Sequence, residues 1–178
     1  MNRRDALIKT NIGWLCQALD LLDRLDDAAF ASSPAGMEPH RAGAHLRHIV
    51  EFYQAFLAGV PSFHIDYDAR RRDPEIERSR KAASNAIRTI IHELNSSSAL
   101  RFDATVWVRM EDEPATAIPE PYLESSIDRE LQVLSSHTIH HFALIAMTLR
   151  LHGVPMPPEF GMAPSTLRYE ATRGAEAA

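Results

Sequence analysis

The chain is poor in cysteine and glycine and has no long apolar run, and each shortage excludes a class of protein. Its 178 residues include one cysteine, Cys16, so no disulfide can form within the chain and we expect a reducing compartment, the cytoplasm. No apolar stretch approaches the roughly 20 residues of a membrane-spanning helix, and Lys9, Gln17 and Asp20 interrupt the N-terminal one. We expect Cys16 to be a small buried side chain in a soluble protein.

Positive charge is also in short supply. The 19 lysines and arginines are outnumbered by 24 acidic residues, which gives a net charge of −5 and argues against a nucleic-acid partner. One basic cluster, Arg70 to Arg72, is flanked by acidic residues on both sides. We interpret this cluster as a solvated loop that leads into a helix, with an anion-binding site as the less favoured alternative.

Amphipathic helices account for most of the remaining sequence. Apolar residues recur at three- and four-residue steps over about 5–25, 42–57 and 74–94, and again from a cap at Ser125 or Ser126 to Gly153. With 45% hydrophobic residues, the chain can bury one core. The pattern predicts an all-α four-helix bundle as a single domain over residues 1–170, followed by a disordered tail at 171–178.

The segments between these helices carry other signals. Residues 104–110 are rich in β-branched and aromatic residues, and 115–119 could pair with them across 111–114, which predicts a small β-hairpin between the third and fourth helices. Residues 26–40 have the composition of a loop. The proline-rich segment 154–170 contains Phe160 and Tyr169, and we expect it to pack back on the bundle.

Two histidines on the last helix suggest chemistry. His137 and His141 are four residues apart, so both imidazoles leave the same helix face with Cβ atoms roughly 5–6 Å apart. Leu134 and Ile145 continue this face, so we expect the rings to point into the core. They could bind one metal ion, or they could be core histidines that are satisfied by carbonyl groups.

A third imidazole comes from the second helix. His48 lies beside Phe52 on the margin of the apolar face, and a bundle can bring it opposite His137 and His141. Three neutral imidazoles would leave a divalent ion with an open position, and Zn²⁺, Ni²⁺ and Fe²⁺ all accept such ligands. An ion in this site would acidify a bound water or a bound thiol.

The motifs HLRHIVE and HTIHHFALI together resemble the DinB/YfiT-like superfamily of bacterial metal-binding four-helix bundles, which is unrelated to the DNA polymerase of similar name. The resemblance implies that His48, His137 and His141 are the metal ligands. Glu51 occupies a position where Asp is common, and Phe142 one where a small polar or basic residue often follows the last ligand. Characterised relatives include metal-dependent transferases and isomerases that use low-molecular-weight thiols.

Several neighbouring residues have open roles. Glu51 could orient a ligand or act as a catalytic base, or could be a solvated or salt-bridged glutamate. His45 could touch the site, His140 is expected to pack beside it rather than bind the ion, and Arg168 with Tyr169 could close over it. The remaining histidines are expected to titrate in water: His40, His64, His92 and His152.

These expectations lead to three hypotheses about function. The first is a thiol-dependent transferase that acts on a small electrophile, with Glu51 handling a proton. The second is a metal-dependent hydrolase, and the third is a non-catalytic metal-binding stress-response bundle. In each case we expect a small-molecule ligand rather than a nucleic acid or a membrane, and the apolar helix faces are compatible with a homodimer.

Overall fold

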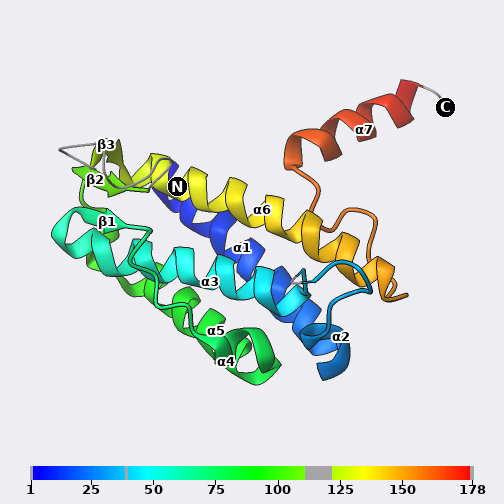
Figure 1. The fold of residues 1–178 in the computed structure, drawn as a ribbon. Coiled ribbons are helices and arrows are strands. Elements are labelled where there is room, and N and C mark those ends of the chain that lie inside the picture. The colour runs from blue at the N-terminus through cyan, green and yellow to red at the C-terminus, as the bar shows by residue number, and fades with distance from the viewer. Residues whose placement is uncertain (1, 39, 111–121, 177–178) are drawn as a thin grey trace.

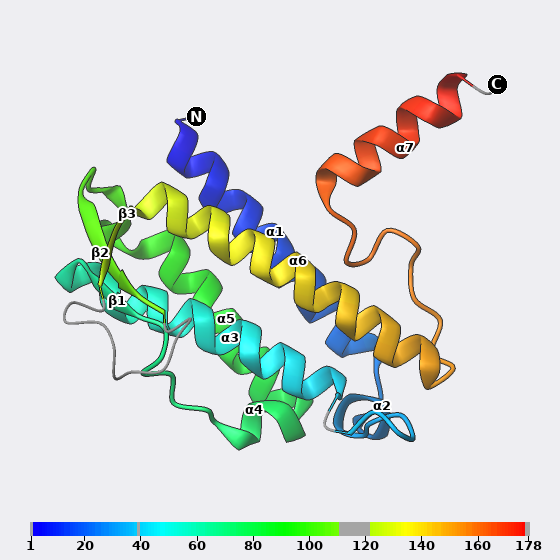
Figure 2. The ribbon, with the colours of Figure 1, turned by 45° about the horizontal axis from the view of Figure 1, so that its top comes forward.

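Four long helices form the body of the protein (Figure 1). The computed structural model describes residues 2–38, 40–110 and 122–176. In both views, α3 (Ala42–Gly59) lies beside α6 (Ile127–Leu151), and α1 (Arg3–Arg24) and α5 (Arg80–Ser96) complete the bundle (Figure 2). The core lies between these helices, so the predicted four-helix bundle is confirmed.

Two short helices modify the predicted boundaries. The loop expected at 26–40 contains α2 (Asp27–Ala31), which the Asp26 side chain caps by accepting the N–H of Ala29. The helix expected at 74–94 is divided into α4 (Pro74–Arg78) and α5, so its predicted continuity is wrong. Ser79 ends α4 in an extended conformation, and its side chain then caps α5. The apolar periodicity continues through both helices and favours one long helix, but the Ser79 cap starts a new helix at Arg80.

A small sheet closes one end of the bundle. Strand β1 (His64–Asp66) runs parallel to β2 (Thr105–Arg109), which pairs antiparallel with β3 (Leu123–Ser126). The strand predicted near 104–110 is confirmed, and both of its edges are occupied by β1 and β3. The partner predicted at 115–119 lies outside the described residues. The antiparallel partner of β2 is β3, which leads directly into α6.

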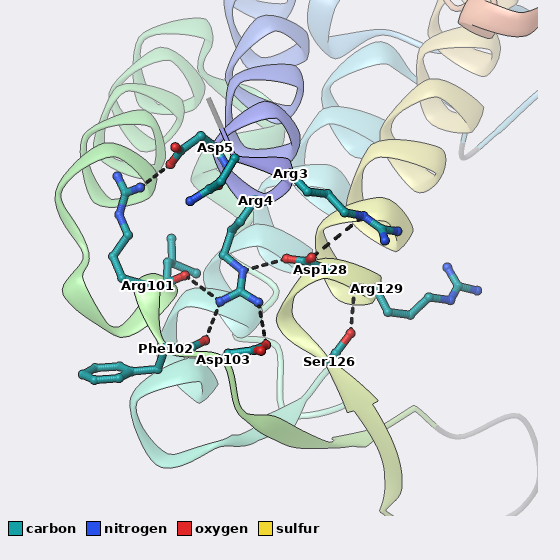
Figure 3. Close-up of polar contacts among 11 residues, drawn as sticks. Arg3, Arg4, Asp5, Arg101, Phe102, Asp103, Ser126, Asp128 and Arg129 are labelled. Atoms are coloured by element: carbon teal, nitrogen blue, oxygen red, sulfur yellow. Dashed lines mark hydrogen bonds and ion pairs between the residues drawn. The ribbon is translucent and has the colours of Figure 1, made fainter.

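An arginine cluster fixes the start of α6 against α1 near this sheet (Figure 3). Nε of Arg4 donates to Oδ1 of Asp128 over 2.6 Å, and one terminal nitrogen donates to the carbonyl oxygen of Phe102 over 2.5 Å. Asp103 accepts a longer contact of 3.4 Å from the other terminal nitrogen. The Arg4 side chain is only 12% exposed, whereas that of Asp103 lies in solvent. The bond from Arg4 to Asp128 is therefore the better shielded one, and it positions the helix that carries two of the histidines.

Polar side chains inside the core align α3 with α6. The Tyr53 hydroxyl donates to Asn11 over 2.7 Å, and Asn11 donates in turn to the Leu131 carbonyl on α6 over 3.0 Å. The Thr138 hydroxyl lies 3.3 Å from that of Tyr53. These hydrogen bonds are buried, so a sliding of α3 against α6 would break contacts that water cannot replace. The network is adjacent in sequence to His137 and therefore helps to fix its position.

The C-terminal segment packs on the bundle and then leaves it. Phe160 stacks on Phe142, with ring centroids 4.7 Å apart, as expected for this segment. Helix α7 (Pro164–Glu176) then projects away from the bundle (Figures 1 and 2) and includes residues 171–176 of the expected tail. Arg168 and Tyr169 are exposed on α7, so no closure over the histidines is seen. The domain boundary at residue 170 stays a prediction.

Cys16 is exposed, so its predicted burial is wrong: the residue lies beside the apolar stripe of α1 rather than within it. None of the helices in the described part of the chain is both long and apolar enough to cross a membrane.

Candidate metal centre

Three histidines from two helices meet where α3 packs beside α6. His48 comes from α3, and His137 and His141 lie one turn apart on α6. Each ring offers one nitrogen, and these three atoms all lie within 4.8 Å of one another. The ring centroids are 4.9 Å apart for His48 and His137, 4.7 Å for His48 and His141, and 4.5 Å for His137 and His141. The structure thus brings together the predicted set.

The three rings lie at the margin of the core rather than inside it. Leu134 and Ile145, on the same helix, are fully buried, whereas the three histidines are half-buried. The expectation that the imidazoles point into the core is therefore only partly right. Because each of the three side chains is only partly buried, the histidine cluster remains partly accessible from outside.

The chemistry of this donor set fits a divalent metal ion. Burial lowers the pKa of His48 to about 4, assisted by the positive charge of Arg70. Burial likewise lowers the pKa of His137 and of His141 to about 3, so all three rings are neutral at pH 7 and have a lone pair to offer. Nδ1 of His137 is buried without a hydrogen-bond partner among the described residues. Neighbouring nitrogens around a tetrahedral zinc lie about 3.3 Å apart, which small ring rotations would allow here.

His45 lies against one of the three histidines. Its Nδ1 is 3.1 Å from Nδ1 of His141, so one of the two rings donates an N–H to the other. If His141 is the donor, its Nε2 is left with a free lone pair for the ion. Metal-binding histidines are usually oriented in this way by a partner at the second nitrogen. His45 therefore orients the His141 ring. From the sequence alone, His45 could only be said to lie within reach of the site.

Phe52 forms a wall of the site. Its ring stacks on His137 with centroids 4.0 Å apart and meets the edge of His48 at 4.8 Å. The guanidinium carbon of Arg70 lies 4.5 Å from the centre of the Phe52 ring. Arg70 lies on the loop before α4, far from the histidines in sequence, so only the cluster of basic residues from Arg70 to Arg72 could have drawn attention to it.

Glu51, three residues after His48 on α3, is buried and forms an ion pair. It is 2% exposed, and its Oε1 lies 3.4 Å from Nε of Arg47. Arg47 reaches Glu77 on α4 over 2.8 Å, and Arg41 pairs with the same carboxylate. Burial raises the pKa of Glu51, against the opposing charge of Arg47. The salt-bridged alternative is thus observed, and a catalytic role for Glu51 stays a prediction.

His140 is adjacent to the cluster but outside it. Its side chain is exposed, and its ring lies 5.1 Å from that of His141 in an edge-to-face arrangement. The group of nitrogens that could share an ion does not include His140. This placement agrees with the expectation that His140 packs beside the site.

The stability of the metal-free protein should fall as the pH drops below 6.5. In the folded chain the three histidines have pKa values of about 4, 3 and 3, whereas in the unfolded chain they return to about 6.5. The unfolded state therefore binds more protons between these limits, and the stabilising effect of the neutral rings, complete above pH 6.5, is lost progressively toward pH 3. Urea denaturation at pH 7.5 and 5 measures this change. The free energy of unfolding of His137→Asn should depend less steeply on pH. The same dependence in this variant and in the unsubstituted protein would show that His137 is not a source of the effect.

Comparison with known proteins agrees with the fold and the histidines. Residues 17–145 match the DinB superfamily. A curated protein, FK506-binding protein 5 of the fungus Rhizopus delemar, is 34% identical over 105 residues, which are 59% of this chain and 27% of that protein. The chain thus spans about a quarter of the length of that relative. Because the family match covers most of the chain and includes all three histidines, the protein belongs to the DinB superfamily.

Proposed function

We propose that this protein is a divalent-metal-dependent transferase that joins a low-molecular-weight thiol to a small electrophile. The supporting observation is the convergence of three neutral imidazoles, from His48, His137 and His141, at an accessible margin of the bundle. Three protein ligands are typical of catalytic metal sites, in which a further position stays open for water or substrate. When bound, the ion would lower the pKa of a thiol in that position until it loses its proton.

The side chains around the histidines would orient the reactants and handle the proton. Phe52 covers one side of the imidazoles with an apolar ring and limits the access of water there. Sulfur forms a bond to carbon of the electrophile as the leaving group departs with its bonding electron pair. Glu51 accepts the thiol proton and passes it to solvent, so the reaction involves no change of oxidation state. The raised pKa of Glu51 brings this carboxylate closer to a useful proton acceptor at neutral pH.

The activity can be tested with 2-mercaptoethanol and 1-chloro-2,4-dinitrobenzene, whose thioether product is coloured. Turnover should require both the thiol and an added divalent ion, and Glu51→Gln should lower kcat by about 100-fold, as loss of a general base does. The exposed Glu75 provides the matched control, because Glu75→Gln removes the same charge away from the histidines. Hydrolysis of an activated ester without thiol would instead favour the hydrolase, and metal binding without either activity would favour a non-catalytic bundle.

A further inference from the structure

A pocket lies between α1 and the strap, the name used here for residues 154–163 between α6 and α7 (orange in Figure 2). Its volume is about 280 Å³, and none of the described residues that line it is a histidine, so it is separate from the candidate metal centre. An apolar cavity of roughly 150 Å³ is enough to bind benzene. The pocket therefore has room for a molecule of about two rings.

The strap is fixed to α6 at both ends, so the pocket exists without a ligand. Near its start, the N–H of Val154 donates to the carbonyl oxygen of Leu149 over 2.9 Å. Near its end, Phe160 stacks on α6, and a β-carbon on Gly161 would lie 2.5 Å from the backbone nitrogen of Ala143. Three of the residues between these ends are prolines, whose rings restrict the backbone. A ligand would thus bind with little ordering of the chain.

The wall of the pocket is apolar. It includes apolar side chains that the free protein leaves only partly buried: Trp14, Val154, Met156, Met162 and Leu167. The indole N–H of Trp14 already donates to the Ser135 hydroxyl over 2.8 Å. Within the described ranges, every buried side-chain polar atom without a partner belongs to a residue outside this pocket. The buried part of a ligand would meet no unpaired polar group, so we expect it to be hydrocarbon.

The polar residues of the pocket lie at its rim. All of them are exposed: Gln17, Asp20, Arg24 and Glu159. They carry charges of both signs, and solvent screens them, so the rim does not select an anion or a cation. A charged ligand would also lose its hydration against the apolar wall, which is costly. The pocket therefore favours an uncharged molecule.

The lining side chains favour an aromatic ligand over an aliphatic one. Trp14 and Phe160 contribute rings, and rings pack on other rings in offset or edge-to-face arrangements. Met156 and Met162 contribute thioether sulfurs, which make favourable contacts with the edges of aromatic rings and adapt to their shape.

We propose that this pocket binds an uncharged aromatic molecule of about two rings. Burial of the partly exposed apolar side chains of the wall drives the association. The site is additional to the proposed thiol transfer and does not depend on it. For a ligand of this size, the expected dissociation constant is on the order of 0.1 mM.

The first test is calorimetric titration of the full chain with 2-naphthol, which has two rings and is uncharged at neutral pH. Met156→Trp should weaken binding by about tenfold or more, because the larger side chain takes up space that the ligand needs. Met147→Trp is the matched control, because Met147 is 54% exposed on α6 and does not line the pocket. This control variant should bind 2-naphthol as the unsubstituted protein does.

The two tryptophans of the chain provide a second pair of variants, which removes bulk instead of adding it. Trp14→Leu should weaken binding by about tenfold, because an aromatic contact is lost. Trp107→Leu should have no effect, because Trp107 lies on β2 and does not line the pocket. Circular dichroism is measured for every variant, so that a misfolded protein is recognised.

Two analogues test the class of ligand. The anion 2-naphthoate and the saturated alcohol decahydro-2-naphthol have a similar size, and both should bind more weakly than 2-naphthol. Binding of either analogue as tightly as 2-naphthol would overturn the assignment of an uncharged aromatic ligand.

The outcomes also separate this proposal from the metal site. Saturable binding that Met156→Trp and Trp14→Leu weaken, and that His141→Ala leaves unchanged, supports the pocket even if no thiol transfer is detected. The proposal is overturned if no saturation occurs at ten times the expected dissociation constant, if both pocket variants bind normally, or if His141→Ala abolishes binding. It is also overturned if binding decreases with rising protein concentration as dimers form in sedimentation, because a second copy would then occupy the pocket.

Discussion

Replacing His141 by alanine should abolish the binding of one equivalent of Zn²⁺ while the protein remains helical. Among the described residues, three histidines each offer one ring nitrogen to the candidate metal site, and His141 is one of them. Loss of a residue that merely orients a ligand costs 10–100-fold in affinity, so loss of the ligand itself should cost more than about 100-fold. Alanine is a good helix former, and the position is only half-buried, so α6 should persist. Calorimetry and elemental analysis measure the loss.

The neighbouring histidine provides the matched control. His140→Ala removes an imidazole from the adjacent position of the same helix, but its exposed ring lies outside the cluster. This variant should retain the ion with nearly the affinity of the unsubstituted protein. Unchanged metal content in His141→Ala, or its loss in His140→Ala, would show that the wrong ring has been assigned.

Gly43→Ala should destabilise the fold by about 2 kcal/mol or more, because α3 and α4 touch through their backbones at this position. A β-carbon on Gly43 would lie 2.1 Å from the carbonyl oxygen of Glu77, and no side-chain rotation can relieve a contact with backbone. The clash exceeds the gain of 0.5–1 kcal/mol that alanine normally brings to a helix, so the two helices must separate. Chemical denaturation should show a lower midpoint at an unchanged slope.

Gly13, on α1, is the control for this substitution. No atom comes within 4 Å of a β-carbon built there, and the residue is exposed in the middle of a helix. Gly13→Ala should therefore stabilise the protein by about 0.5–1 kcal/mol. Equal effects of the two substitutions would contradict the close approach of α3 to α4.

The parts of the structure that depend on local periodicity could be predicted from the sequence. The four-residue spacing of His137 and His141 defines a shared helix face whatever surrounds it, and the position of His48 required only that two helices pack side by side. A cap at Ser125 or Ser126 was likewise readable, because a capping side chain acts on a residue three positions away, and the structure identifies Ser126 as the cap.

The remaining features depend on contacts between distant parts of the chain. Arg70 meets Phe52 only because the segment around β1 folds back along α3, and no short pattern encodes that path. The pairing of β2 with β3 was missed for the same reason, since a nearer segment had an acceptable strand composition. Sequence spacing placed His45 on the same side of α3 as His48, but only the packing of α6 shows that it faces His141.

The half-exposed position of the three rings has a consequence for how the protein would acquire its ion. The ligands project from two helices that the apolar core and the Asn11, Tyr53 and Thr138 hydrogen bonds already hold together. An ion could thus enter or leave without unfolding the chain, unlike in small zinc-dependent domains, where the metal and the fold are inseparable. Imidazole ligands accept several divalent ions. The relative abundance of free metals in the surroundings, rather than a selective step during folding, would then decide which ion occupies the site.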